Sequence, residues 1–299
     1  MVGKITKRGF LRLAGMGGVV FASGLPGFTA RSLAAGMADE FYFVQLSDSH
    51  WGFEGAKVNP DAKGTLPKAI AAVNALPEPP DFVVFTGDIT HTTDDAKERR
   101  RRMAEAKEII GKLNVKTLYF LAGEHDASLD KGEAFQEFFG KTSYTFDHKG
   151  VHFIALDNVS DPRATLGDAQ IAWLEADLKQ QKPDQPIVVL THRPLFDLAP
   201  SWDWATRDGG KAIDLLMPFK NVVVFYGHIH QEHHQTTGHI AHHAAKGLMY
   251  PLPAPLSQPQ KAPIPWDEAQ PYRGLGFRDI EAEEKGKEIK ITELAIGKT

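Results

Sequence analysis

Five short apolar runs, each followed at once by a polar motif, constrain the fold of this 299-residue chain more than any other feature. The runs are rich in β-branched and aromatic residues and lack a polar face, which is typical of strands buried on both sides. They span residues 41–46, 82–85, 117–121, 187–190 and 222–226. Helix-like segments lie between them, for example 66–76, 95–113 and 167–181. This alternation of strands and helices predicts an α/β fold.

The polar motifs that end these runs combine carboxylate and imidazole side chains. In chain order they are Asp48-Ser49-His50, Gly87-Asp88, Gly123-Glu124-His125-Asp126, Thr191-His192 and Gly227-His228-Ile229-His230. Because open α/β sheets bind ligands at the carboxyl ends of their strands, we expect the five motifs to converge in one cleft. Carboxylates and neutral imidazoles suit Mn, Fe and Zn, and a chain without cysteine offers no thiolate.

The spacing within the motifs suits a site for two metal ions. Asp48 and His50 are two residues apart on an extended segment, so both side chains can turn toward one ion. Asp88 has two carboxylate oxygens and can bridge two ions. His228 and His230 are again two residues apart, which lets them bind different ions.

In this order, the five motifs resemble those of the calcineurin-like metallophosphoesterase family over residues 41–253. The resemblance implies a four-layer α/β/β/α sandwich with two mixed β-sheets and the metals at one rim. It implies a first ion held by Asp48, His50, Asp88 and His230, and a second held by Asp88, Glu124, His192 and His228. Two Mn, Fe or Zn ions about 3.5–4 Å apart would clamp the phosphoryl oxygens and activate a bridging water as the in-line nucleophile.

The same resemblance assigns roles to residues beside the metals. His125 would not be a ligand, but would contact the phosphoryl group or the leaving oxygen and protonate it. Asp126 would hold the imidazole of His125 in its working orientation. Arg193 follows a metal ligand and has two open interpretations: its guanidinium forks onto a phosphate oxygen, or it caps a loop ahead of Pro194.

Glu124 departs from the family motif, in which Gly-Asn-His-Asp stands where this chain has Gly-Glu-His-Asp. A glutamate adds a negative charge and a methylene to a neutral oxygen ligand. This charge should tighten metal binding and weaken the attraction for an anionic phosphate. Three interpretations follow: an active variant with Glu124 as ligand, a loosely held second metal, or a site that binds metal or a small ligand without hydrolysis.

The N-terminal 35 residues predict an export signal. Residues 6–12 resemble the twin-arginine motif, with Lys7 in place of the first arginine, and a glycine-rich apolar stretch follows over 13–30. Small residues over 32–35 suit cleavage. We therefore expect contact with the export machinery and a periplasmic or secreted protein without a stable membrane anchor. A signal of the general secretory route or a lipid-free anchor is the alternative.

The chain beyond Arg31 has 29 Lys and Arg against 38 Asp and Glu. This acidic balance argues against binding to nucleic-acid polymers or anionic membranes. We expect a metallophosphoesterase domain over residues 40–299, which includes a proline-rich segment at 249–265 and two C-terminal strands near 275–281 and 288–294.

Other histidines and tryptophans lie near the motifs. His91 follows Asp88 by three residues and is either near the cleft or only a loop residue. The histidine-rich stretch from His228 to His243 could bind a further metal, and His233 or His243 could touch substrate, although exposed loop positions are the simpler interpretation. Three tryptophans on predicted loops could stack on a flat substrate group or pack within the loops. They are Trp51, Trp202 and Trp204.

Together these observations predict an exported hydrolase of small phosphate esters that acts on phosphodiesters, either cyclic-nucleotide-like or generic. A phosphomonoesterase at the same site is one alternative, and a non-catalytic metal- or ligand-binding protein is another. Glu124 is the sequence feature on which the choice between an enzyme and a binding protein depends, because it changes the total charge of the second ion's ligands. The sequence leaves open the substrate, the identity of the metals and the oligomeric state.

Overall fold

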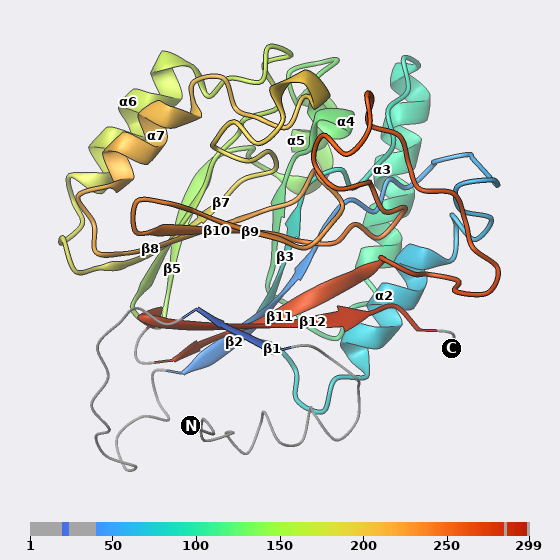
Figure 1. The fold of residues 1–299 in the computed structure, drawn as a ribbon, viewed down its shortest axis with the longest axis horizontal. Helices are drawn as coiled ribbons and strands as arrows, with labels where there is room; N and C mark the ends of the chain where they lie inside the picture. The colour runs from blue at the N-terminus through green and yellow to red at the C-terminus, as the bar shows by residue number, and fades with distance from the viewer. Residues whose placement is uncertain (1–19, 24–39, 284–285, 298–299) are drawn as a thin grey trace.

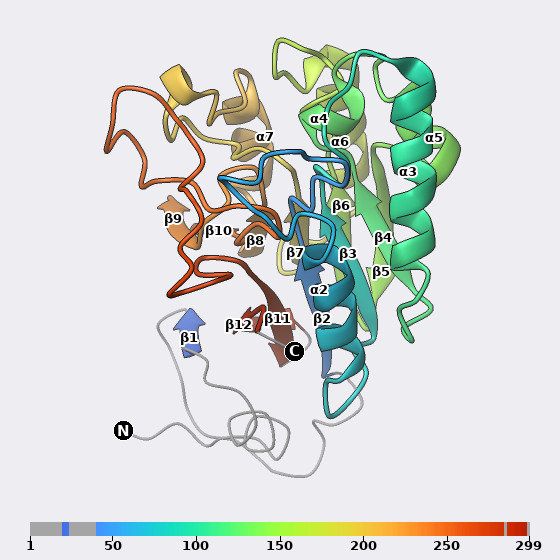
Figure 2. The same ribbon diagram turned by 90° about the vertical axis from the view of Figure 1, so that its right-hand side faces the viewer.

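The computed structural model describes residues 20–23, 40–283 and 286–297. Two mixed β-sheets lie face to face, and helices cover the outer face of each sheet (Figures 1 and 2). The predicted four-layer α/β/β/α sandwich is therefore confirmed. No helix within the described residues is both long and apolar enough to span a membrane.

The first sheet has six strands in the order β1-β12-β11-β2-β3-β4. Its strands are β1 (Val20–Ser23), β2 (Phe41–Leu46), β3 (Phe82–Thr86), β4 (Leu118–Leu121), β11 (Gly276–Glu283) and β12 (Glu288–Ala295). The pairs β2–β3 and β3–β4 are parallel, and the other pairs are antiparallel. The predicted C-terminal strands thus pair with each other and with β2, while β1 lies outside them.

The second sheet also has six strands, in the order β5-β6-β7-β8-β10-β9. They are β5 (Tyr144–His148), β6 (Val151–Ala155), β7 (Pro186–Leu190), β8 (Asn221–Tyr226), β9 (His233–Thr237) and β10 (Ile240–Ala244). The four central strands are parallel, with antiparallel β5 and β9 at the two edges. In both sheets the parallel strands direct their carboxyl ends to the same rim of the sandwich (Figure 1).

The helices divide between the two outer faces. The helices are α2 (Thr65–Asn74), α3 (Ala96–Ile110), α4 (Glu124–Ala127), α5 (Glu133–Phe139), α6 (Gly167–Leu178) and α7 (Gly209–Leu216), with a short 3-10 turn at Pro200–Trp202. Helices α2, α3 and α5 pack on the first sheet, whereas α6 and α7 pack on the second. Asp95 caps α3, because its side chain accepts from the backbone N–H groups of Lys97 (2.8 Å) and Glu98 (3.2 Å).

Alternating side chains of each central strand fill two different cores. In β2, Phe41 and Phe43 point between the sheets, whereas Tyr42, Val44 and Leu46 contact the helices. The strands of the second sheet divide in the same way between the middle core and helices α6 and α7. This explains why the runs show no polar face: each strand is covered on both sides.

The predicted leader, residues 1–35, lies outside the described residues except for β1, which pairs antiparallel with β12. The basic block at 99–102 lies on α3 and is ion-paired. Arg101 and Arg102 contact Glu98, and Arg100 contacts Glu137. Arg99 is buried and paired with Asp130.

Candidate dinuclear metal site

The five polar motifs converge at the rim where the parallel strands end. Two groups of side chains there place one donor atom each within 4.8 Å of the others. They are Asp48, His50, Asp88 and His230 in the first group, and Asp88, Glu124, His192 and His228 in the second. Asp88 belongs to both groups, as a bridging carboxylate would. All these side chains are buried except that of Glu124, which is 18% exposed.

Backbone carbonyls orient three of the histidines. The Nδ1 atom of His192 lies 2.6 Å from the carbonyl oxygen of Thr86, and that of His230 lies 2.7 Å from the oxygen of Tyr250. His228 uses its other nitrogen, since its Nε2 atom lies 2.8 Å from the oxygen of Asp203. In each ring the remaining nitrogen is directed toward the carboxylates, which is how outer contacts select the tautomer of a metal-binding histidine.

Three potential metal-donor atoms lie close together around the carboxylate of Glu124. Its Oε2 atom lies 2.8 Å from Nε2 of His192 and 3.0 Å from Nδ1 of His228. These three buried atoms nevertheless lack a hydrogen-bond partner of suitable geometry within the described residues. Buried lone pairs that converge without hydrogen bonds are costly unless a cation occupies the point between them. The donor set therefore fits a metal ion.

Glu124 is ionised in this environment. Burial alone would raise its pKa, but His228, Arg193 and His192 offset that effect and hold the pKa of Glu124 well below its usual range. The nearest guanidinium nitrogen of Arg193 lies 3.7 Å from its carboxylate. The second group of ligands thus contains a full negative charge where an asparagine would be neutral.

The backbone at the strand ends adopts a rare conformation. Five non-glycine residues of the two groups have positive φ angles between 40° and 66°: Asp48, His50, Asp88, His228 and His230. Such angles are uncommon for residues with a Cβ atom and tend to occur at functional sites. Gly87 has a φ of 94°, and a Cβ atom there would lie 2.3 Å from the His192 ring. The strained turns aim successive side chains into the cleft.

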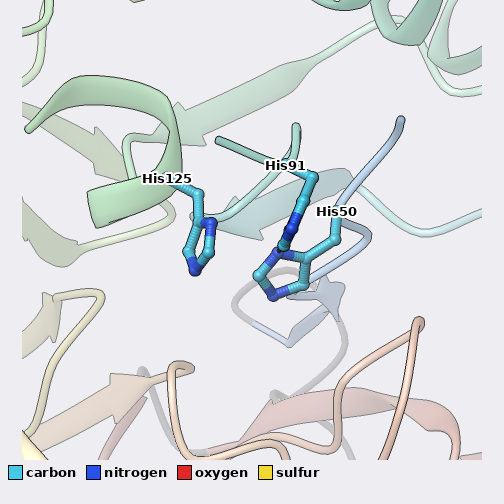
Figure 3. A group of neighbouring side chains, drawn as sticks. All are labelled: His50, His91 and His125. Atoms are coloured by element: carbon cyan, nitrogen blue, oxygen red, sulfur yellow. Dashed lines mark hydrogen bonds between the residues drawn. The ribbon is translucent and has the colours of Figure 1, made fainter. Parts of the chain in front are cut away.

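His125 lies at the mouth of this cleft, on α4 (Figure 3). Its Nδ1 atom is 2.6 Å from the hydroxyl of Thr92 and accepts from the Thr92 backbone N–H at 3.2 Å. Asp126 does not contact this ring: its oxygens accept from the backbone N–H groups of Ile89, Thr90 and Gly123. The prediction that Asp126 orients His125 was therefore wrong. Asp126 joins two loops, and Thr92 holds the imidazole.

His91 is nearer to the site than its loop position suggested. Its Nδ1 atom lies 3.3 Å from Nδ1 of His50, and its ring stacks on that of His125 at 4.8 Å (Figure 3). Burial, followed by the charge of His125, lowers the pKa of His91 to about 4. The segment 91–92 therefore contacts both His50 and His125. Its position just after Asp88 was the one signal in the sequence that pointed to this role.

Arg193 has the loop-capping role of its two predicted alternatives. Its guanidinium donates to the backbone oxygen of Asp203 at 2.7 Å and pairs with the Asp203 carboxylate at 2.6 Å. The side chain is only 6% exposed. These contacts tie one guanidinium nitrogen to the loop that positions His228, while the other terminal nitrogen lies 3.7 Å from the carboxylate of Glu124.

The remaining candidates are dispersed. Trp202 and Trp204 are buried and pack edge to face within a loop, and Trp51 donates to Glu105 at 2.9 Å. Loop packing is therefore the interpretation that the structure supports. His233 and His243 contact Tyr226 and His234, respectively, and neither belongs to a candidate metal group among the described residues.

The cleft opens into a cavity of about 140 Å³. Its walls are formed by the candidate metal ligands, by His125 and by the proline-rich segment. The lining residues are His50, Asp88, Glu124, His125, His228, His230, Tyr250, Leu252, Lys261 and Pro263. A phosphoryl group can therefore approach both groups of ligands from one side.

Known proteins resemble this chain in sequence and in fold. The model of the calcineurin-like phosphoesterase family matches residues 41–232. The chain is 26% identical over 217 residues to the serine/threonine-protein phosphatase CPPED1 of Danio rerio, covering 64% of this chain and 70% of that protein. It is 25% identical over 234 residues to a Rhodopseudomonas palustris protein named a probable cyclic nucleotide phosphodiesterase, covering 70% and 78%. The structure of a dimetal phosphatase from Danio rerio has a similar fold, with a TM-score of 0.57 and 12% identity over 86% of this chain and 97% of that one.

Proposed function

The chain belongs to the calcineurin-like phosphoesterase family, and we propose that it hydrolyses phosphodiesters with two bound metal ions. The observation that carries this proposal is the pair of four-residue donor groups that share Asp88. The carboxylate oxygens and imidazole nitrogens of these two groups suit Mn, Fe or Zn. When bound, such ions would supply Lewis-acid stabilisation of the phosphoryl oxygens and lower the pKa of a coordinated water.

We assign the ligands of the first ion to Asp48, His50, Asp88 and His230. The second would use Asp88, Glu124, His192 and His228. The backbone carbonyl contacts described above hold the rings of His192, His228 and His230. The protein therefore holds a preformed set of ligands, which limits the reorganisation needed on binding.

His125 is the residue that we propose to contact the substrate. Its Nδ1 atom is held by Thr92, which leaves Nε2 for the cavity that the ring lines. With Nδ1 as the acceptor from Thr92, the imidazole carries its proton on Nε2 and can donate a hydrogen bond to a phosphoryl oxygen or to the leaving oxygen. The backbone N–H of His125 donates to Oδ1 of Asp88 at 2.9 Å, so the acid and the shared carboxylate keep a constant separation.

The charge of the site supports a diester as substrate. Three carboxylates, from Asp48, Asp88 and Glu124, would face two divalent ions and leave one positive charge. A phosphodiester has one negative charge and matches this remainder, whereas a monoester dianion exceeds it. The relative named as a cyclic nucleotide phosphodiesterase agrees with this preference.

We also propose that the protein is exported. The support is the twin-arginine-like pattern at residues 6–12 and the small residues at 32–35. A periplasmic or secreted location would follow, with the export machinery as a partner. Fusion of residues 1–40 to a reporter would test this proposal, and retention of the reporter in the cytoplasm would contradict it.

Hydrolysis of bis-p-nitrophenyl phosphate, with p-nitrophenyl phosphate in parallel, tests the enzymatic proposal. The protein would be reconstituted with Mn or Fe and its metal content measured. We expect diester turnover that is lost in the variants His125→Ala and Asp88→Asn. His239→Ala serves as the control, because His239 is exposed and lies at the tip of the β9–β10 hairpin. Two bound metals without turnover of either ester would support a non-catalytic binding protein instead.

A further inference from the structure

Lys261 is the only lysine or arginine that lines the cavity among the described residues. It lies in the proline-rich segment, is exposed, and its ammonium group makes no hydrogen bond or ion pair within the described part of the chain. Arg193, the other cation near the metal ligands, is engaged by Asp203. An unengaged positive charge therefore lines the same cavity as Asp88 and Glu124.

Several contacts hold the proline-rich segment over the cleft. Gln231, next to the metal-binding motif, donates to the backbone oxygen of Pro253 at 2.8 Å. The backbone N–H of Ile264 donates to Pro251 at 3.0 Å, and that of Trp266 donates to Lys57 at 3.0 Å. These contacts lie on both sides of Lys261 in the chain, so its backbone is anchored at the rim.

The charges around the cavity indicate what Lys261 could bind. With two divalent ions, the three carboxylates leave a single positive charge at the reacting centre. Lys261 adds a second positive charge at the edge of the same cavity. If the ions bind to the candidate ligands, a charged group elsewhere on the cavity lining would act on the part of the substrate that extends from the metals.

We propose that Lys261 is a specificity-determining residue that binds a second anionic group of the substrate. The preferred substrate would then be a phosphate ester with a total charge of −2. Because the proposed function is diester hydrolysis, that charge would come from a diester with a carboxylate or a second phosphate on its alcohol. This inference rests on the proposed function and deepens it.

Equilibrium binding of two unreactive probes to the metal-loaded full chain tests the proposal. Inorganic phosphate is a dianion at pH 8, whereas dimethyl phosphate is a monoanion. We expect Lys261→Ala to weaken phosphate binding about tenfold, to change dimethyl phosphate binding less than about threefold, and to leave metal content unchanged. Lys261→Arg should restore phosphate binding. Equal losses for both probes, or no loss for either, would overturn the proposal.

A control variant at another lysine and a double variant with Glu124→Asn make the test more specific. Lys116 is exposed just before β4, at the end of the strand away from the site, so Lys116→Ala should have no effect. In a Glu124→Asn background the site gains one positive charge. There the effect of Lys261→Ala on phosphate binding should fall to about threefold, because the remaining charge partly compensates.

Kinetics separate the failure of this inference from the failure of the proposed function. Lys261→Ala should raise the KM of a diester that bears a carboxylate on its alcohol. The KM of bis-p-nitrophenyl phosphate should change little. Lysine-dependent phosphate binding without any turnover would refute the proposed function alone. Diester turnover with phosphate binding unaffected by Lys261→Ala would refute the inference alone.

Discussion

At position 124, a carboxylate lies between two imidazoles and faces a guanidinium. Glu124 contacts His192 and His228 within 3.0 Å and lies 3.7 Å from Arg193. Its longer side chain therefore reaches the same pair of histidines that a neutral oxygen ligand would join. This geometry supports Glu124 as a ligand rather than as a side chain turned away from the metal.

Replacement of Glu124 by asparagine should keep or raise turnover. The variant removes one of three negative charges, so it should weaken metal binding and strengthen attraction for an anionic ester. We expect metal affinity to fall about tenfold, as outer or inner ligand changes commonly do. Titration of metal together with the bis-p-nitrophenyl phosphate assay at saturating metal would measure both effects.

Glu124→Gln is the matched control, because it removes the charge and keeps the length of the side chain. If charge is the cause, both variants should behave alike. A large fall in turnover of Glu124→Asn with unchanged metal content would refute this prediction and show that the glutamate takes part in the reaction.

At the scale of the elements, the strands set the site through the turns that end them. The motifs after β2, β3 and β8 contain residues with positive φ, so neighbouring side chains on one turn can face one centre. Close packing between turns adds a second constraint. Gly87 approaches both the His192 ring and the backbone nitrogen of Gly123, so two motifs distant in the chain meet there.

Gly87→Ala should therefore destabilise the protein and reduce its metal content. A Cβ atom would lie 2.3 Å from the His192 ring and 2.8 Å from the Gly123 backbone, in addition to the cost of a φ of 94°. We expect a loss of more than about 2 kcal/mol in the free energy of unfolding. Chemical denaturation with metal analysis would measure it.

Gly140→Ala is the control for the backbone angle alone. Gly140 has a φ of 93°, and a Cβ atom there meets nothing within 4 Å. Its φ of 93° and ψ of −159° lie in a region almost exclusive to glycine, so we expect a cost of about 1–3 kcal/mol with the metals left in place. Similar losses in the two variants would show that the clash with His192 is unimportant.

At the scale of the whole molecule, the second sheet buries an unpaired histidine away from the site. His242 on β10 is fully buried, and neither ring nitrogen has a hydrogen-bond partner within the described residues. Burial lowers the pKa of His242 to about 4. The folded protein thus holds a neutral imidazole that the unfolded chain would protonate at mildly acidic pH.

This difference predicts a loss of stability in acid. The pKa of His242 is near 6.5 when unfolded and about 4 when folded. The unfolded state therefore binds more protons below pH 6.5, and stability falls progressively down to about pH 4. Between pH 7.5 and 5 this one group should cost about 2 kcal/mol.

Urea denaturation of the wild type and His242→Phe at both pH values would measure this contribution, with equal metal loading. The variant should lose less stability on acidification than the wild type. An unchanged pH dependence in His242→Phe would contradict the prediction.

The sequence predicted much of this architecture because its signals are local. The run Phe82–Phe85 is apolar throughout because helices and a second sheet cover β3 on both sides. The positions of Asp88 and His192 directly after strands were sufficient to place them at one rim. The helix predicted at 95–113 was found at Ala96–Ile110, with Asp95 as its cap.

The partners of the site residues were not predictable in this way. The contact of Thr92 with His125, where Asp126 was expected, depends on how two separate loops approach each other. The contacts of Asp203 with His228 and Arg193 depend on loop packing in the same way. Such contacts leave no periodic pattern, since each loop approaches at an angle set by the packing beneath it.

The sequence by itself thus determined the fold class, the order of the strands that carry the motifs, and the residue types available to bind metal. Only the tertiary structure decided which nitrogen of each histidine faces the cleft, that Arg193 is occupied, and that Lys261 lines the cavity. The physical reason is the separation along the chain of the residues that interact. Periodicity and strand ends follow from neighbours in the chain, whereas tautomers and free charges depend on atoms that folding brings together from distant segments.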